Sequence, residues 1–273
     1  MLQYIYFFLI IIMTIKAKKS LGQNFLTSEK AIADIAAATC AGIGDTILEI
    51  GPGMGALTRA LLDTGAHVVA VEKDDRLIPE LQTLFVDDIA SGRLTLVHGD
   101  ALTLDLATYN LNPGTYILAA NIPYYITGLI IRRFFSRAHL PKHVVLLVQK
   151  EVARRAVAGK GDASILSIAI QTYGTPHIAR TIPRGMFTPS PTVDSAVLVV
   201  EHMSDPFTSN ENERVYFETV RKGFAHKRKL LASNLGCGQD TLQACTIEKT
   251  ARAENLSVAD WHALCAHPSA HSF

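Results

Sequence analysis

Short β-branched runs alternate with helical patterns from about residue 46 onward, and this alternation restricts the fold more than any other feature of the sequence. Strands that alternate with helices are typical of βαβ units, in which neighbouring strands lie parallel. The sequence therefore predicts an α/β fold around a mostly parallel, seven-stranded sheet that ends at about residue 202. The runs that indicate strands are TILEI (46–50), HVVAVE (67–72), LTLVHGD (94–100), YILAA (116–120), HVVLLVQ (143–149) and SAVLVVE (195–201). Helical patterns lie between them at 55–65, 76–85 and 164–174.

The remainder of the chain shows no strand pattern. Residues 203–210 are rich in Ser, Pro and Asn, which suits a linker. Residues 214–235 repeat apolar side chains at helical spacing, and Ser257 precedes Asp260 by three positions, as in a capping box. We predict an α/β domain at 14–202 and a small α-helical domain at 211–273.

Composition limits the partners and the metal chemistry that this chain can have. The chain has 273 residues, of which 48% are hydrophobic and 19% charged, and can bury a full core. Its net charge of +1 means that a nucleic-acid partner would have to be held by local basic patches. The four cysteines lie far apart without metal-ligand spacing, so we expect no metal site and reduced thiols in a cytoplasmic protein.

The first thirteen residues, MLQYIYFFLIIIM, are apolar. They are fewer than the roughly 20 residues of a membrane span, and no basic segment precedes them. We therefore expect no stable membrane partner. Two interpretations stay open: residues 1–13 are an extension from a mis-assigned start, or they form a weak membrane-surface anchor.

A glycine-rich loop follows the first strand. In LEIGPGMGALT, Gly51, Gly53 and Gly55 stand between a strand and a helix, where glycine lets the backbone approach a ligand closely. Glu72 ends the next strand, a position from which a carboxylate accepts ribose hydroxyls. The loop also fits the pattern of a nicotinamide-binding fold and that of a tight turn without a ligand. Asp100 ends the third strand, where it could accept an adenine amine or cap the following turn.

The stretch NIPYY follows the fourth strand and needs a separate explanation. The amine of adenine is a weak nucleophile, because its lone pair is delocalised into the ring. The side-chain oxygen of Asn121 and a main-chain carbonyl stiffened by Pro123 could accept both N–H bonds and aim the lone pair at a methyl donor. Tyr124 could stack on a base flipped out of its helix, with Tyr125 packed behind it. A turn carrying surface tyrosines is the plainer interpretation.

Seven segments occur together in one order: KKSLGQNFL, ILEIGPGMGALT, VVAVEKD, HGDAL, ANIPYYI, FTPSPTVDSAVL and FAHKRKLLASNL. In this order the chain, from residue 18 to about 265, resembles the rRNA adenine dimethyltransferases, and among them the small-subunit enzymes of the kasugamycin-sensitivity type. The resemblance implies a Rossmann-like, S-adenosylmethionine-dependent methyltransferase domain. It also implies dimethylation of two adjacent adenines in the 3′-terminal hairpin of small-subunit rRNA, a partnership with the immature small subunit and a monomeric enzyme.

Site residues follow from the resemblance and the loop together. The expected S-adenosyl-L-methionine site comprises Asn24, Leu26, Gly51, Gly53, Glu72, Asp100 and Asn121. The catalytic residues are expected to be Asn121, Pro123, Tyr124 and Phe187. Of these, Phe187 resembles the second stacking aromatic of the family. For Phe187, a core position held by neighbouring prolines remains an equal alternative.

Two basic clusters are candidates for binding RNA phosphates. For the first of them, a solvated helix surface is the alternative. The sequence HKRK replaces the paired arginines expected at this place in the family, so charge attraction is kept while bidentate clamping is in doubt. The first cluster comprises Arg221, Lys222, Lys227, Arg228 and Lys229; the second, which could line the same groove, comprises Lys142, Lys150, Arg154, Arg155 and Lys160.

Three rival functions stay open at this point. A nicotinamide-dependent oxidoreductase would use the glycine loop but would have no use for NIPYY. A methyltransferase for large-subunit rRNA or DNA adenines would share the same turn. An assembly factor whose binding matters more than its catalysis would share the whole sequence pattern.

Overall fold

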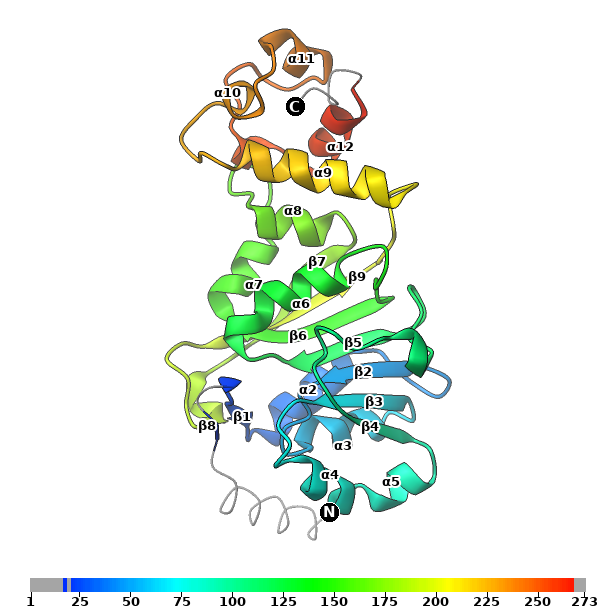
Figure 1. Ribbon diagram of the computed structural model, residues 1–273. Coiled ribbons are helices and arrows are strands. Elements are labelled where there is room, and N and C mark those ends of the chain that lie inside the picture. Colours follow the sequence, from blue (N-terminus) through cyan, green and yellow to red (C-terminus); the bar gives the residue numbers. More distant parts are fainter. Residues whose placement is uncertain (1–16, 19–20, 268–273) are drawn as a thin grey trace.

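A seven-stranded sheet forms the centre of the protein, in the order β4-β3-β2-β5-β6-β9-β7. The computed structural model describes residues 17–18 and 21–267 (Figure 1). Strands β4 to β6 in this order run parallel, and β9 runs antiparallel to both of its neighbours. The predicted α/β fold with a mostly parallel sheet is therefore confirmed. The strands are β2 (Thr46–Ile50), β3 (His67–Glu72), β4 (Leu94–His98), β5 (Ile117–Asn121), β6 (His143–Gln149), β7 (Thr175–Ile182) and β9 (Ser195–Glu201).

Helices cover both faces of the sheet, which explains why the central strands are apolar at almost every position. Alternate strand residues such as Ile47 and Leu48 belong to two different core clusters. One face packs against α2 (Glu29–Ala38), α3 (Ala56–Leu62), α4 (Ile78–Leu84) and the neighbouring α5 (Val86–Ala90). The other face packs against α6 (Thr127–Phe134), α7 (Lys150–Ala156) and α8 (Ile165–Gln171).

Strand β7 is the one strand of the sheet that the sequence pattern did not indicate. It pairs with β9 alone, so it lies at an edge, and its residues alternate between exposed and partly buried. An edge strand tolerates Pro176 because one row of its backbone groups has no partner strand.

A second sheet of two short strands brings distant segments together. β1 (Phe25–Leu26) pairs antiparallel with β8 (Phe187–Thr188), and Thr27 N–H donates to the Met186 carbonyl at 2.9 Å. This pair lies at one end of the large sheet in Figure 1. It places the segment before α2 against the carboxyl ends of the central strands.

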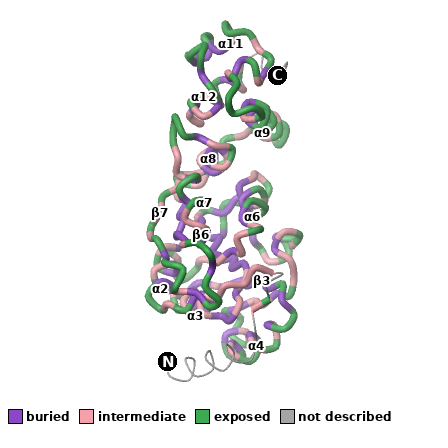
Figure 2. The backbone as a smooth tube through the Cα atoms, turned by 90° about the vertical axis from the view of Figure 1, so that its left-hand side faces the viewer, coloured by how far each residue is buried: buried purple, intermediate pink, exposed green. Residues whose placement is uncertain are grey.

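The C-terminal part is helical and carries its own core. It contains α9 (Asn210–Gly223), α10 (Leu231–Leu235), α11 (Gln239–Ala244) and α12 (Val258–Ala266), packed around the fully buried Trp261. The same core includes Ile168 of α8, so the helices rest on the α/β part (Figures 1 and 2). The capping box of Ser257 and Asp260 is confirmed. The described part of the chain also contains the 3₁₀ turns η2 (Ala107–Tyr109), η3 (Tyr124–Ile126), η4 (Arg184–Met186) and η5 (Ala253–Asn255).

One detail of this part differs from the predictions. The helical pattern at 214–235 is not one helix, because the chain turns between Gly223 and Leu231. Within the predicted linker, the ring of Phe207 lies 5.8 Å from that of Tyr173 and 5.2 Å from that of Tyr216. The domain boundaries remain a prediction.

The apolar start, residues 1–13, lies outside the described residues. Within the described ranges, no helix is long and apolar enough to cross a membrane. The same residues contain no group of three or more His, Cys, Asp or Glu side chains that could hold a metal ion.

Candidate functional site

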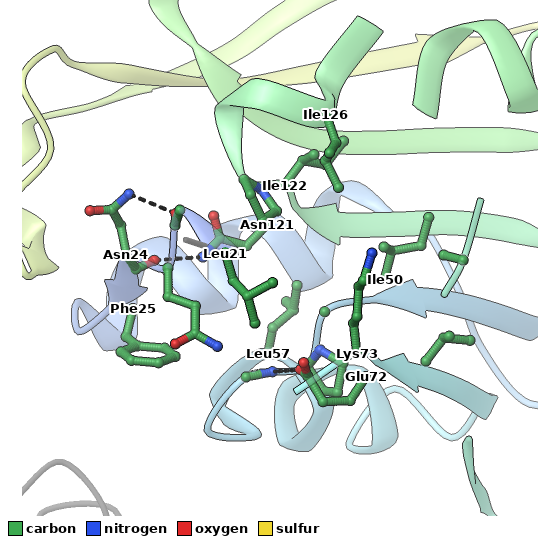
Figure 3. A pocket seen from close by; sticks show the side chains of 18 of the residues that line it. Leu21, Asn24, Phe25, Ile50, Leu57, Glu72, Lys73, Asn121, Ile122 and Ile126 are labelled. Carbon is green, nitrogen blue, oxygen red and sulfur yellow. Dashed lines mark hydrogen bonds between the residues drawn. The ribbon is translucent and has the colours of Figure 1, made fainter. Parts of the chain in front are cut away.

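A pocket opens at the carboxyl ends of β2, β3 and β5, where parallel α/β sheets commonly bind ligands (Figure 3). Residues 21–26 close one of its sides. The structure brings together in its lining every residue predicted for catalysis or for the cofactor: Asn24, Leu26, Gly51, Gly53, Glu72, Asp100, Asn121, Pro123, Tyr124 and Phe187.

The glycine loop requires glycine for more than one reason. Gly51, Gly53 and Gly55 have φ angles of +70°, +59° and +81°, which strain any residue with a Cβ. A Cβ on Gly55 would lie 2.6 Å from the Phe85 ring, so this glycine serves packing. A Cβ on Gly51 would meet no atom within 4 Å, so the backbone at Gly51 faces open space that a ligand can fill.

Glu72 lies at the end of β3 and is 5% exposed. Its Oε2 accepts from Gly53 N–H at 3.0 Å, and its Oε1 accepts from Asp74 N–H at 2.7 Å. Burial raises the pKa of Glu72, while these N–H groups act to lower it. The carboxylate is thus fixed against the glycine loop, and each oxygen keeps a lone pair for a hydroxyl donor.

Asp100 follows β4 on the same side of the pocket. Its Oδ2 accepts from Lys73 Nζ at 2.7 Å and its Oδ1 from Leu102 N–H at 2.9 Å. Burial acts to raise the pKa of Asp100, but the Lys73 ammonium and the Leu102 N–H hold it below its ordinary value. The turn-capping role considered for Asp100 is therefore present, together with a charged acceptor at the pocket.

Asn121 ends β5 and faces the segment before α2. Its Nδ2 donates to the main-chain oxygen of Asn24 at 3.3 Å, and the Asn24 side chain turns away to donate to the Gly22 carbonyl at 3.1 Å (Figure 3). Within the described residues, no donor reaches Asn121 Oδ1. The amide therefore has a fixed donor side and an acceptor left for a ligand.

Aromatic residues stand beside this amide. Tyr124 is partly buried, and its hydroxyl forms a 2.7 Å hydrogen bond with Ser195 Oγ, which fixes the ring. Phe187 both lines the pocket and belongs to the core, being 4% exposed. Tyr125 does not pack behind Tyr124: it is 59% exposed and lies next to Gly22 at the rim.

The first basic cluster is exposed throughout. Arg221 and Lys222 belong to the last turn of α9, whereas residues 227–229 lie in the turn between α9 and α10. The helical pattern predicted for 214–235 is therefore wrong for residues 227–229. In the described part of the chain, no acidic side chain forms an ion pair with any of the five residues.

The second basic cluster is divided. Lys142 precedes β6 and pairs with Asp45, whereas Lys150 follows the same strand. The seven residues of β6 lie between them, so the two backbone positions are roughly 26 Å apart in extended strand. Lys142 is therefore at the opposite edge of the sheet from the pocket, and the expectation that it lines the same groove is wrong. Lys160 pairs with Asp260 of the C-terminal part at 3.2 Å.

The pocket residues fit a bound nucleoside. The open backbone at Gly51, the buried carboxylate of Glu72 and the charged acceptor Asp100 are separate features suited to close backbone approach, ribose hydroxyls and an amine. This donor set supports a methyltransferase-type cofactor site.

Comparison with known proteins agrees with this geometry. Residues 14–267 match the family described as Ribosomal RNA adenine dimethylase, and the chain belongs to this family. Its fold is that of the methyltransferases.

Among the relatives, the protein named Ribosomal RNA small subunit methyltransferase A from Dehalococcoides mccartyi (strain CBDB1) is 37% identical over 260 residues, covering 92% of this chain and 88% of the relative. Its namesake from Geobacter sulfurreducens is also 37% identical, covering 92% and 94%. Among solved structures, a dimethyladenosine transferase from Plasmodium falciparum superposes with a TM-score of 0.75 at 26% identity, covering 88% and 95%. The 23S rRNA methyltransferase ErmE superposes with a TM-score of 0.69 at 24% identity, covering 88% and 98%.

Several residues of the site were not found from the sequence. Gln23, Lys73, Asp74 and Ser195 contact the predicted residues or hold them in place. Lys73 and Asp74 directly follow Glu72, and Gln23 directly precedes Asn24, so adjacency to a predicted residue was the available signal. Ser195 lies in the segment FTPSPTVDSAVL, but its contact with Tyr124 had no local signal, because the two residues are 71 positions apart.

Proposed function

We propose that the chain transfers methyl groups from S-adenosyl-L-methionine to the exocyclic amines of two adjacent adenines in the 3′-terminal hairpin of small-subunit rRNA. Family membership and the names of the bacterial relatives support this target over a nicotinamide-dependent reaction or a large-subunit adenine. The observation that carries the proposal is that Asn121 lines the same pocket as Gly51 and Glu72.

The cofactor supplies an electrophilic methyl group on a sulfonium sulfur. With the cofactor bound, Glu72 would accept from the ribose hydroxyls and Asp100 from the adenine amine, and the backbone at Gly51 and Gly53 would allow close approach. The N-terminal segment, with Asn24 and Leu26, covers the remaining side.

The target amine is positioned by acceptors. Asn121 Oδ1 accepts one N–H and the carbonyl of Ile122, fixed by Pro123, accepts the other, so that the nitrogen lone pair is directed along the line of transfer. Tyr124 and Phe187 hold the flipped base between them. The amine becomes acidic only after the methyl group has been added, so its proton can pass to water and no side-chain base is required.

Phosphates of the RNA are proposed to contact the exposed cluster of Arg221, Lys222, Lys227, Arg228 and Lys229, whose charges no acidic neighbour neutralises among the described residues. The partner is then the immature small subunit, bound by a monomer of this chain.

The test is methyl transfer from labelled S-adenosyl-L-methionine to small subunits that lack the modification, followed by nucleoside analysis. We expect dimethyladenosine at two adjacent positions. Label in large-subunit rRNA alone, or no label in either RNA, would overturn the proposal.

A further inference from the structure

Residues 21–26 form the N-terminal wall of the pocket, and hydrogen bonds join this wall to the loop after β3. Gln23 Nε2 donates to Asp74 Oδ2 at 2.8 Å, and Gln23 Oε1 accepts from Lys18 N–H at 2.7 Å. Both polar ends of this side chain are therefore engaged. Gln23 spans the gap between its own segment and a residue 51 positions later.

Asp74 is a firm anchor for this contact. It is 1% exposed, and the Arg76 guanidinium donates to it at 2.9 and 2.6 Å. The Arg76 ion pair is the main cause that lowers the pKa of Asp74, to about 2, so the carboxylate stays charged at neutral pH. The Asp74 N–H in turn donates to Glu72, so one loop holds both the ribose acceptor and the N-terminal wall.

Asn24, the residue after Gln23, connects the wall to Asn121. The main-chain oxygen of Asn24 accepts from Asn121 Nδ2, which sets which side of the Asn121 amide is the acceptor (Figure 3). A displacement of the wall would release this amide to rotate, and would move Asn24 and Leu26 from the pocket lining.

We propose that Gln23 is a positioning residue for methyl transfer: by bridging to Asp74 it holds the segment 21–26 over the cofactor site and thereby orients Asn121. Gln23 itself need not touch the reacting atoms. The inference rests on the proposed use of S-adenosyl-L-methionine, because it assigns a role to a wall of that site.

The experiment compares Gln23→Leu with Gln171→Leu in the full chain. Leucine keeps most of the volume of glutamine but removes its polar atoms. Gln171 is a matched control, because its Nε2 donates to the carbonyls of Ala156 and Ala158, both at 2.9 Å, away from the pocket lining. Affinity is measured by calorimetric titration with S-adenosylhomocysteine, and stability by thermal unfolding without ligand.

We expect Gln23→Leu to weaken S-adenosylhomocysteine binding about ten-fold or more and to lower kcat at saturating cofactor. Gln171→Leu should lower the unfolding temperature by a similar amount with unchanged affinity. If Gln23→Leu binds as the parent chain does, or if both variants lose affinity alike, the positioning role is wrong. If the parent chain itself fails to bind, the proposed function fails instead.

A reversal of donor and acceptor gives an independent check. Gln23→Glu alone places a second carboxylate against Asp74 and should weaken binding further. Adding Asp74→Asn supplies an amide donor to that carboxylate and should restore a substantial part of the affinity. Absence of any recovery in the double variant, with its fold intact by circular dichroism, would count against the bridge.

Discussion

Glu49 should make the stability of this protein fall as pH rises, and substitution by glutamine should remove that dependence. The residue lies in β2 with 1% exposure, and both carboxyl oxygens lack a hydrogen-bond partner among the described residues. Burial is the main cause that raises the pKa of Glu49 from 4.5 to about 8; the Thr58 hydroxyl acts to lower it, and the charge of Glu72 acts to raise it further.

The sign follows from proton binding. Between these two pKa values the unfolded chain has released the proton that the folded chain retains, so the unfolded state binds fewer protons and stability falls with increasing pH. The slope is about 1.4 kcal/mol per pH unit, which amounts to about 4 kcal/mol between pH 5 and pH 8. The stability associated with a neutral Glu49 is fully present below pH 4.5 and is lost as pH rises through 8.

Glu49→Gln replaces the acid by a neutral group of the same shape. Its unpartnered amide costs about 1 to 3 kcal/mol, but this cost does not depend on pH. The free energy of unfolding of the variant relative to the parent should therefore rise by roughly 4 kcal/mol from pH 5 to pH 8.

Chemical denaturation at four pH values measures this difference, in which the other titrating groups cancel. Glu248→Gln, at an exposed position, serves as the control for replacing a surface carboxyl by an amide. A flat difference for Glu49→Gln would refute the reasoning, because it would mean that the Glu49 carboxyl titrates alike in the folded and unfolded chains.

Three further predictions concern the proposed reaction. Asn121→Ala should lower methyl transfer by about 100-fold or more while retaining association with immature small subunits, as measured by labelled transfer and co-sedimentation; loss of both properties together would contradict it. Glu72→Gln turns an amide donor toward the N–H of Gly53 or of Asp74, so calorimetry should show about ten-fold or more weaker binding of S-adenosylhomocysteine, and an unchanged affinity would argue against Glu72 as the ribose acceptor. Alanine at all three positions 227–229 should reduce the salt dependence of RNA binding in a filter-binding assay. The slope of log K against log salt should fall by up to about 0.9 for each phosphate that is no longer neutralised, and Lys142→Ala serves as the unaffected control. An unchanged slope would exclude this turn from the RNA interface.

The sequence predicted the central strands because they are buried on both faces. Such strands must be apolar at nearly every position, and this pattern needs no knowledge of their neighbours. Strand β7 includes Pro176, His177 and Arg180 among its eight residues, so it lacks the apolar run of the central strands, and its strand conformation depends on hydrogen bonds to β9. A strand whose main support is its pairing partner cannot be recognised from local composition.

The same limit explains where α9 ends. Apolar residues continue at helical spacing past Gly223, so the local pattern favours a longer helix. The structure packs Gly223 against Trp261 of α12 so closely that a Cβ there would lie 2.4 Å from the indole ring. That contact joins residues almost forty positions apart, so the local sequence pattern does not reveal it.

The residues of the candidate site at the carboxyl ends of the strands were predictable, because the order of strands and helices in the sequence predicts a parallel sheet. Glu72 and Asn121 each end a parallel strand and Asp100 follows β4 closely, and neighbouring parallel strands end at one edge. The contacts of Gln23 and Ser195, which support these residues, could not be predicted, because the tertiary fold brings their partners near.

The pairing of β1 with β8 has a consequence for the order of events as the chain is made. Phe25 emerges early in synthesis, yet its partner Thr188 follows only after nearly all of the large sheet has been translated. A nascent chain that stops before β8 can form the glycine loop and Glu72 but lacks the strand that holds the N-terminal wall in place. Binding of the methyl donor is thus expected only once β8 has been synthesised, when the polypeptide is almost complete.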